Sequence, residues 1–221
     1  MIGNSYAIKL IPAIYTTFNG NFSILENFMY SGCEPLFHPY EDTKNCCADL
    51  IRFMFAKVER MKPDVLFIIT RYLSDFSKTP YMGDQDSLVI EANKRLAKLM
   101  PHVGTIVISG PMPKWEMEIG NGVNRRLKMG LPLQDLTFTR DTHYLQHQHT
   151  EMRLAHLNCS SCLFINMLYP FCGAQNQTCQ LYDENSKIAL YDDTMHMSHR
   201  ASELIIPHLQ ELLKPLMQIN G

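Results

Sequence analysis

Residues 62–73 read KPDVLFIITRYL, and this stretch decides the fold class of the chain. Lys62 and Pro63 end an expected helix, because proline cannot continue one. The apolar run from Val65 to Thr70 has the length and the β-branched residues of a fully buried strand. Such a strand is typical of a parallel sheet that helices cover on both faces.

The same alternation of strand and helix continues in both directions from this stretch. Further strands are expected at 24–30, 105–109 and 163–167, and helices at 7–18, 51–61, 89–99, 142–157 and 201–209. Ser198 is a suitable N-cap for the last helix, and Pro207 predicts a kink or break within it. The order predicts one α/β domain over residues 1–221, with three α/β/α layers and about five parallel strands.

Two segments depart from this regular pattern. Met1 and Ile2 alone precede Gly3, so the first strand is expected to be truncated. Residues 111–141 are expected to be the least regular part of the chain, a long loop near a strand end. Such loops either shape a substrate site or are simply loops, and the sequence leaves both open.

The overall charge balance gives no electrostatic argument for binding to nucleic acid or to an anionic membrane. Twenty Lys and Arg residues stand against 22 Asp and Glu residues, for a net charge of -2 over 221 residues. No apolar run approaches the roughly 20 residues that a membrane-spanning helix needs. The first ten residues also lack the basic and apolar regions of a signal peptide.

The cysteines point to an oxidising compartment. The chain has seven: Cys33, Cys46, Cys47, Cys159, Cys162, Cys172 and Cys179. Cys172 and Cys179 bracket a turn that is suited to a small disulfide loop. Cys33 precedes a loop that ends at the Cys46-Cys47 pair. The middle pair, spaced C-x-x-C, is either a disulfide or two unrelated cysteines. Free buried thiols in a reducing compartment are the alternative.

We therefore expect an extracytoplasmic protein. Three N-x-S/T sequons, at Asn21, Asn158 and Asn176, add little weight because such triplets arise by chance. Because the first residues carry no signal, the chain is expected to come from a longer precursor.

Ser5 is the first candidate for catalysis. It follows the strand stub in IGNSYA and precedes a helix, where N–H groups and the helix dipole stabilise negative charge. Taken alone, Ser5 is better explained as a helix N-cap, for which serine is a favoured residue.

Asp193 and His196 are the second candidates. They stand as D-x-x-H in YDDTMHMS, just before the last helix. A carboxylate three residues before a histidine can fold back onto the imidazole and fix its tautomer, as a serine triad requires. Asp192 is adjacent, but the three-residue spacing favours Asp193.

Several blocks together resemble the SGNH hydrolase superfamily, most closely the SGNH domain of acyltransferase-3 membrane proteins. These blocks are GNSYA (3–7), SGCEPLF (31–37), KPDVLFIITRYL (62–73) and FCGAQNQTCQLYDENSKIALYDDTMHMS (171–198). The resemblance implies a flavodoxin-like SGNH fold with Ser5 as nucleophile, His196 as general base and Asp193 as its orienting partner. It also implies that an integral-membrane acyltransferase domain accompanies the chain.

Two blocks depart from the family pattern. Asn4 replaces the usual Asp, and Arg71 ends the third strand where other SGNH hydrolases place a Gly-x-Asn oxyanion donor. By the resemblance, the oxyanion donors would be the N–H groups of Ser5 and Gly32. Asn4 and Arg71 are expected near the substrate or behind the site. Arg71 either supplies positive charge or acts as a structural ion-pair partner.

A histidine-rich helix is the remaining candidate for a functional site. His143 and His147 are spaced i,i+4, as metal ligands on a helix can be, but no Glu stands in the H-E-x-x-H arrangement. A polar helix face is the expected explanation. We expect neither a metal nor a cofactor.

These features predict a serine-dependent acyltransferase or esterase that works through an acyl-enzyme, with an acyl donor and a hydroxyl acceptor as partners. O-acetyl groups on carbohydrate or other hydroxyl-bearing molecules are the expected substrates. One alternative is an inactive SGNH-fold binding or scaffolding module, which the truncated first strand and Arg71 favour. Another is a cytosolic α/β esterase with free thiols.

Overall fold

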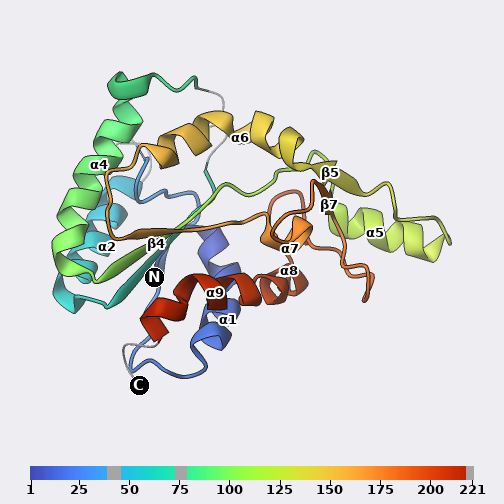
Figure 1. The fold of residues 1–221 in the computed structure, drawn as a ribbon, viewed down its shortest axis with the longest axis horizontal. Coiled ribbons are helices and arrows are strands. Elements are labelled where there is room, and N and C mark those ends of the chain that lie inside the picture. The colour runs from blue at the N-terminus through green and yellow to red at the C-terminus, as the bar shows by residue number, and fades with distance from the viewer. Residues whose placement is uncertain (39–45, 73–78, 218–221) are drawn as a thin grey trace. The chain divides into compact units, whose positions relative to one another are not determined.

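The computed structural model describes residues 1–38, 46–72 and 79–217 (Figure 1). Within these residues the chain forms two compact units. The first unit contains Met1–Ile8, Ile24–Pro111 and His147–Ile165, and the second contains Lys9–Ser23, Met112–Gln146 and Asn166–Gly221.

A parallel sheet forms the centre of the first unit. Its strands are β1 (Ile2–Gly3), β2 (Phe28–Met29), β3 (Val65–Ile69), β4 (Thr105–Ser109) and β6 (Cys162–Ile165), in the order β2-β1-β3-β4-β6. All four pairings are parallel. Although β1 has two residues, Ile2 pairs with Phe28 on one side and with Ile68 on the other. The predicted α/β class, the five parallel strands and the short first strand are thus confirmed.

Helices α2 (Cys47–Met61) and α4 (Ser87–Leu99) lie side by side in the first unit (Figure 1). Lys62 adopts the left-handed conformation after α2, and Pro63 follows it. Asp86 caps α4 by accepting hydrogen bonds from the N–H groups of Leu88 and Val89. Short 3-10 helices, η1 (Gly83–Gln85) and η2 (Met100–His102), flank α4.

The core of the first unit lies between these helices and one face of the sheet. It is built from buried apolar side chains that include Ile51, Met54, Leu66, Leu96, Ile106 and Ile108. This packing holds the carboxyl ends of the strands in place, and loops at those ends form the sites of open α/β sheets.

Shorter elements make up the second unit. They are α5 (Ile119–Lys128), β5 (Thr137–Thr139), α7 (Tyr169–Cys172), β7 (Thr178–Gln180), α8 (His199–Leu204) and α9 (Ile206–Met217). Strands β5 and β7 pair antiparallel. Two helices, α1 (Ser5–Phe18) and α6 (Arg140–Ala155), begin in one unit and end in the other.

The bounds of several elements differ from those expected from the sequence, and others agree with them. The stretch expected to be least regular, 111–141, contains the whole of α5 and β5. The strand expected at 24–30 is reduced to β2. The break expected near Pro207 separates α8 from α9, and the hydroxyl of Ser198 accepts a hydrogen bond from the N–H of Ala201 as the predicted cap.

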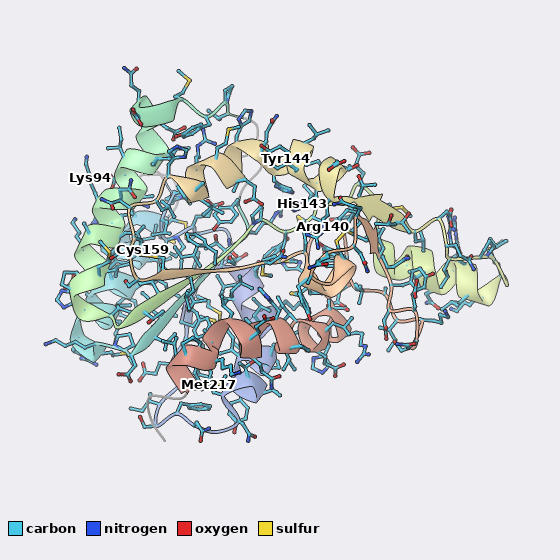
Figure 2. The ribbon with its side chains drawn as sticks, in the orientation of Figure 1. Lys94, Arg140, His143, Tyr144, Cys159 and Met217 are labelled. Atoms are coloured by element: carbon cyan, nitrogen blue, oxygen red, sulfur yellow. A yellow bond between two sulfur atoms is a disulfide. The ribbon has the colours of Figure 1, made fainter. Side chains whose placement is uncertain are left out.

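Three disulfides are present, which confirms the prediction of oxidised cysteine pairs. They join Cys33 to Cys47, Cys159 to Cys162 and Cys172 to Cys179 (Figure 2). Cys46 is an exposed free thiol. Disulfides persist in oxidising compartments, so these bonds indicate an extracytoplasmic location.

No helix within residues 1–38, 46–72 and 79–217 has both the length and the apolar character required to cross a bilayer.

Candidate active site

Ser5, the predicted nucleophile, lies at the turn from β1 into α1. A side chain at Gly3 would place its Cβ 1.9 Å from the carbonyl oxygen of Ile69, so the turn requires glycine. The N–H of Asn4 donates to that same oxygen at 3.2 Å. This close approach to β3 delivers Ser5 as the first residue of α1, where helix N–H groups and the dipole favour developing negative charge.

Asn4 ties this turn to the end of β3. Its side chain is buried, and its Nδ2 donates to the carbonyl oxygen of Arg71 at 3.1 Å. Its Oδ1 accepts from the N–H groups of Arg71 at 3.1 Å and Tyr6 at 3.2 Å. An aspartate could accept both of these bonds but could not donate to Arg71. Asn4 therefore acts as a support for the Ser5 turn and for the backbone of Arg71.

Ser109, at the end of β4, holds the next part of the same segment. Its hydroxyl accepts from the N–H of Thr70 at 3.0 Å and donates to the Thr70 carbonyl at 3.3 Å. The Tyr72 hydroxyl donates to the Ser109 carbonyl at 2.6 Å, and burial raises the pKa of Tyr72. Residues 70–72 are thus fixed by side chains from both neighbouring strands. The roles of Ser109 and Tyr72 depend on contacts between residues 37 to 39 apart, so no local sequence signal indicates them.

Gly32 lies in a tight turn after β2. The N–H of Cys33 donates to the carbonyl of Tyr30 at 3.2 Å, and Gly32 has a φ of 78°, which favours glycine. The N–H of Tyr30 donates to the Gly3 carbonyl at 3.0 Å. The two residues expected to supply oxyanion donors, Ser5 and Gly32, therefore follow the ends of adjacent strands in one unit.

A buried arginine of α4 supports the residues after Gly32. The guanidinium of Arg95 donates to the carbonyl oxygens of Pro35 at 3.1 Å, Leu36 at 3.0 Å and His38 at 2.5 Å. The Cys33–Cys47 disulfide fixes the start of the same segment. Part of the loop that was expected to end at the Cys46-Cys47 pair lies outside the described residues.

A hairpin in the second unit carries Asp193 and His196, the other two predicted catalytic residues. Tyr191 and Met197 form an antiparallel bridge, and the N–H of Asp192 donates to the His196 carbonyl at 2.9 Å. The hairpin places Asp193 and His196 on opposite sides of a reversal of the chain, so that their side chains can meet.

Asp193 holds His196 by both its ring and its backbone. Asp193 Oδ2 lies 2.7 Å from His196 Nδ1, and Oδ1 accepts from the N–H groups of His196 and Met195 at 2.6 Å each. Partial burial would raise the pKa of Asp193, but these hydrogen bonds outweigh it and lower that pKa to about 2. Because Nδ1 faces the carboxylate, Nε2 is the ring nitrogen that can accept a proton.

Residues 113–120, within the segment that was expected to be irregular, contact the backbone of this hairpin and fix its position. The N–H of Trp115 donates to the Thr194 carbonyl at 3.1 Å, and the Tyr191 hydroxyl donates to the Pro113 carbonyl at 2.8 Å. A side chain at Gly120, in the first turn of α5, would place its Cβ 2.9 Å from the carbonyl oxygen of Asp192. Residues 113–120 are therefore a support for the Asp193–His196 pair.

Asp192 makes a different contact from its neighbour. Its carboxylate pairs with the ammonium of Lys9 at 2.5 Å, and Lys9 lies one turn after Ser5 on α1. The carboxylate that contacts His196 is thus that of Asp193, as the three-residue spacing favours.

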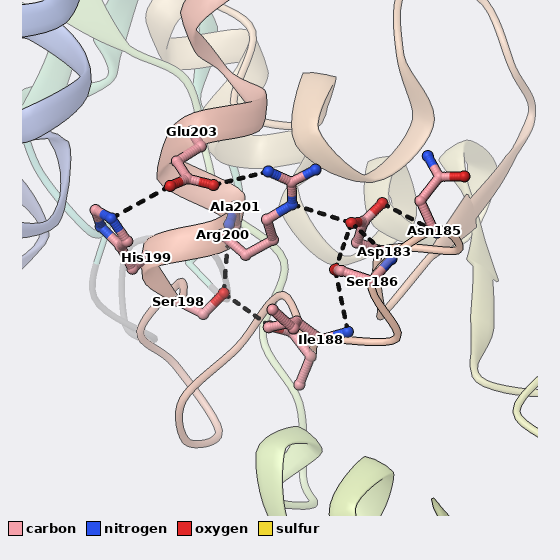
Figure 3. A network of polar contacts seen from close by, with 10 residues as sticks. Asp183, Asn185, Ser186, Ile188, Ser198, His199, Arg200, Ala201 and Glu203 are labelled. Atoms are coloured by element: carbon pink, nitrogen blue, oxygen red, sulfur yellow. Dashed lines mark hydrogen bonds and ion pairs between the residues drawn. The ribbon is translucent and has the colours of Figure 1, made fainter.

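An ionic network anchors the chain on both sides of the hairpin (Figure 3). Arg200 of α8 lies between Asp183, at 3.0 Å, and Glu203, at 2.7 Å. The Ser198 hydroxyl donates to the Ala189 carbonyl at 2.7 Å. This network fixes the beginning of α8 directly after His196.

Two histidines of α6 do not lie on the polar face that the sequence suggested. His143 and His147 are both buried. Among the described residues, no group of three His, Cys, Asp or Glu side chains could hold a metal ion.

A family model described as "SGNH domain (fused to AT3 domains)" matches residues 1–211. The chain belongs to this SGNH domain family. A solved structure with the same fold, titled as the periplasmic domain of a Salmonella ser. Paratyphi A lipopolysaccharide acetyltransferase, aligns with a TM-score of 0.67. It is 14% identical and covers 99% of this SGNH domain and 82% of its own chain. No curated protein matches the sequence.

The family description links SGNH domains of this kind to AT3 domains, and thus to membrane acyltransferases. The predicted site residues of this SGNH domain fall into two sets. Asn4, Ser5, Gly32 and Arg71 belong to the first unit, and Asp193 and His196 belong to the second.

Proposed function

We propose that this SGNH domain catalyses serine-dependent O-acyl transfer or ester hydrolysis, with Ser5 as nucleophile, His196 as general base and Asp193 as its orienting partner. The observation that carries the proposal is the Asp193–His196 pair. Its 2.7 Å contact at Nδ1 leaves Nε2 as the proton acceptor that a serine nucleophile needs.

The reaction would proceed in two steps. His196 Nε2 takes the proton of the Ser5 hydroxyl as Ser5 Oγ attacks the carbonyl carbon of the acyl donor. The resulting oxyanion is stabilised by the N–H groups of Ser5 and Gly32, and the donor's alcohol or thiol leaves with the proton from His196. Water or an acceptor hydroxyl then attacks the acyl-enzyme and His196 takes its proton. The bond between Ser5 Oγ and the acyl carbon breaks, and His196 returns the proton to Oγ, which regenerates the free enzyme.

Arg71 would take the place of the Asn side chain that other SGNH hydrolases use as an oxyanion donor. The side chain of Asn4 bonds to the backbone of Arg71 directly. The hydroxyl of Ser109 bonds to the backbone of Thr70, the residue before Arg71. A guanidinium on so well fixed a backbone can provide positive charge near the developing oxyanion.

We further propose that the transferred group is acetyl and that the acceptor is a carbohydrate or another hydroxyl-bearing molecule. An AT3 membrane domain would supply the acyl group, and the SGNH domain would work beside it on the extracytoplasmic side of a membrane.

The sequon asparagines Asn21, Asn158 and Asn176 are all exposed, as glycosylation requires.

A second candidate function is an inactive binding or scaffolding module. Arg71 stands where other SGNH hydrolases place an Asn that donates to the oxyanion. This difference favours the inactive module, because loss of one oxyanion donor lowers rates by about 10²–10³.

Labelling with a fluorophosphonate probe tests the proposal. The chain should label, and Ser5→Ala and His196→Ala should each abolish labelling. Ser23→Ala and His199→Ala are matched controls, because both residues are exposed, and both variants should label normally. A folded chain that does not label would favour the inactive module, and labelling that persists in Ser5→Ala would refute Ser5 as the nucleophile.

A further inference from the structure

The end of α5 and the turn after it expose three large aliphatic side chains. Leu127, Met129 and Leu131 are 47%, 65% and 47% exposed. Single exposed apolar residues are common on protein surfaces, but three within five residues form a patch that calls for a partner. We name residues 125–132 the α5 tip. Figure 1 shows this turn extending away from β5 and β7.

The α5 tip is held in a defined conformation. Gly130 has a φ of 64°, its N–H donates to the Leu127 carbonyl at 3.2 Å, and the N–H of Leu131 donates to the Arg126 carbonyl at 2.9 Å. This is a Schellman motif, which closes a helix on a left-handed glycine. The Arg126 guanidinium also donates to the Pro132 carbonyl at 3.0 Å and pairs with Asp135. The apolar side chains are therefore presented on a fixed turn.

Cations flank the apolar side chains. The tip reads RRLKMGLP and contains no acidic residue. Arg125 and Lys128 are exposed, whereas Arg126 is neutralised by Asp135. Exposed aliphatic side chains beside unneutralised cations are complementary to the interface of an anionic bilayer, with its phosphates outside and acyl chains beneath.

We propose that the α5 tip is a membrane-contact surface, with Leu127, Met129 and Leu131 inserted among lipid headgroups and Arg125 and Lys128 on their phosphates. A stable protein partner needs about 800 Å² on each side, usually from about 20–30 residues, whereas the α5 tip is a turn of eight residues. A bilayer needs only a few apolar side chains and cations. The proposal does not depend on the catalytic function.

Vesicle flotation of the whole chain tests this surface. The chain should float with phosphatidylcholine vesicles that contain about 30% phosphatidylglycerol, and added salt should weaken binding. Replacing Leu127, Met129 and Leu131 together with Asp should lower the partition coefficient by more than about tenfold. Arg125→Ser and Lys128→Ser should each lower it by about fivefold.

Leu145→Asp is the matched control, because Leu145 is 67% exposed on α6 and should not affect binding. All variants should retain the thermal unfolding midpoint of the parent chain. Failure of the parent chain to float would overturn the proposal, as would an equal loss in Leu145→Asp. Self-association that disappears in the triple variant, without vesicle binding, would instead assign the α5 tip to a second copy of the chain.

Discussion

The carboxylate of Asp193 contacts His196 twice, at the ring Nδ1 and at the backbone N–H. The second contact ties the position of the carboxylate to the backbone that carries the imidazole. The pair is therefore a preorganised unit of the hairpin, whichever acyl group the protein handles.

Asp193→Asn should reduce acyl-transfer activity by about 10²–10⁴, because an amide can hold His196 in the wrong tautomer. Initial rates with an activated acetyl ester measure this effect. Asp192→Asn should keep most of the activity, because Asp192 pairs with Lys9. Equal losses in the two variants would contradict the assignment of Asp193.

Asp193 should also make the fold sensitive to acid. Its pKa is lowered from 3.8 to about 2 in the folded chain, so the stability it contributes is complete above pH 3.8 and is lost as the pH falls through about 2. As the pH is lowered from 5 to about 2, the thermal unfolding midpoint should therefore fall less steeply for Asp193→Asn than for the parent chain. Parallel curves would show that the carboxylate contributes no such linkage.

Asn4→Asp should lower the free energy of unfolding by about 1–3 kcal/mol. The substitution replaces the donor to Arg71 with a carboxylate oxygen that faces the Arg71 carbonyl, in a buried position. Urea titration measures the loss, and Asn27→Asp, at an exposed position, should change little. A fully stable Asn4→Asp chain would mean that the segment after β3 adjusts to accept the carboxylate.

Gly3→Ala should prevent normal folding, because its Cβ would lie 1.9 Å from a backbone oxygen of β3. Gly122→Ala is the contrasting change. Gly122 lies within α5, where a Cβ meets only the flexible end of Met117, and alanine favours helix by up to about 1 kcal/mol. Circular dichroism with thermal unfolding distinguishes the two, and a normally folded Gly3→Ala chain would refute the close approach of β1 to β3.

Thiol titration under denaturing, non-reducing conditions should find one reactive thiol per chain, that of Cys46. Cys46→Ser should reduce the count to zero, and prior reduction should raise the parent chain to seven. A count near seven without reduction would contradict an oxidising compartment and favour the cytosolic esterase alternative.

Local signals made much of the first unit predictable. Pro63 and Pro101 mark the ends of α2 and α4, and the apolar run at 65–70 corresponds to β3 at Val65–Ile69. The strand expected at 24–30 was too long, because β2 pairs with β1, which has two residues. Strand length was here set by the partner and not by the segment itself.

The second unit was harder to predict, for two physical reasons. In α5, Gly120 and Gly122 interrupt a helix with two buried apolar residues, Ile119 and Val123, so the helical period is weak. Strand β5 has three residues and depends on pairing with β7, about forty residues away. Neither feature is visible in a short window of sequence.

The candidate site divides in the same way. Asp193 and His196 are three residues apart, so their contact could be expected from spacing. The contact between Asn4 and Arg71 spans 67 residues and that between Thr70 and Ser109 spans 39. These supports follow from the order of strands in the sheet, which one sequence does not reveal at residue level.

The thiol of Cys46 gives this protein a natural position for a spectroscopic probe. Its sulfur lies 3.6 Å from the hydroxyl of Tyr30, which shares a tight turn with Gly32. A maleimide fluorophore placed there, without any engineered cysteine, would sense the surroundings of that turn. Its emission could therefore follow the arrival of an acyl donor in real time, in the unmodified sequence.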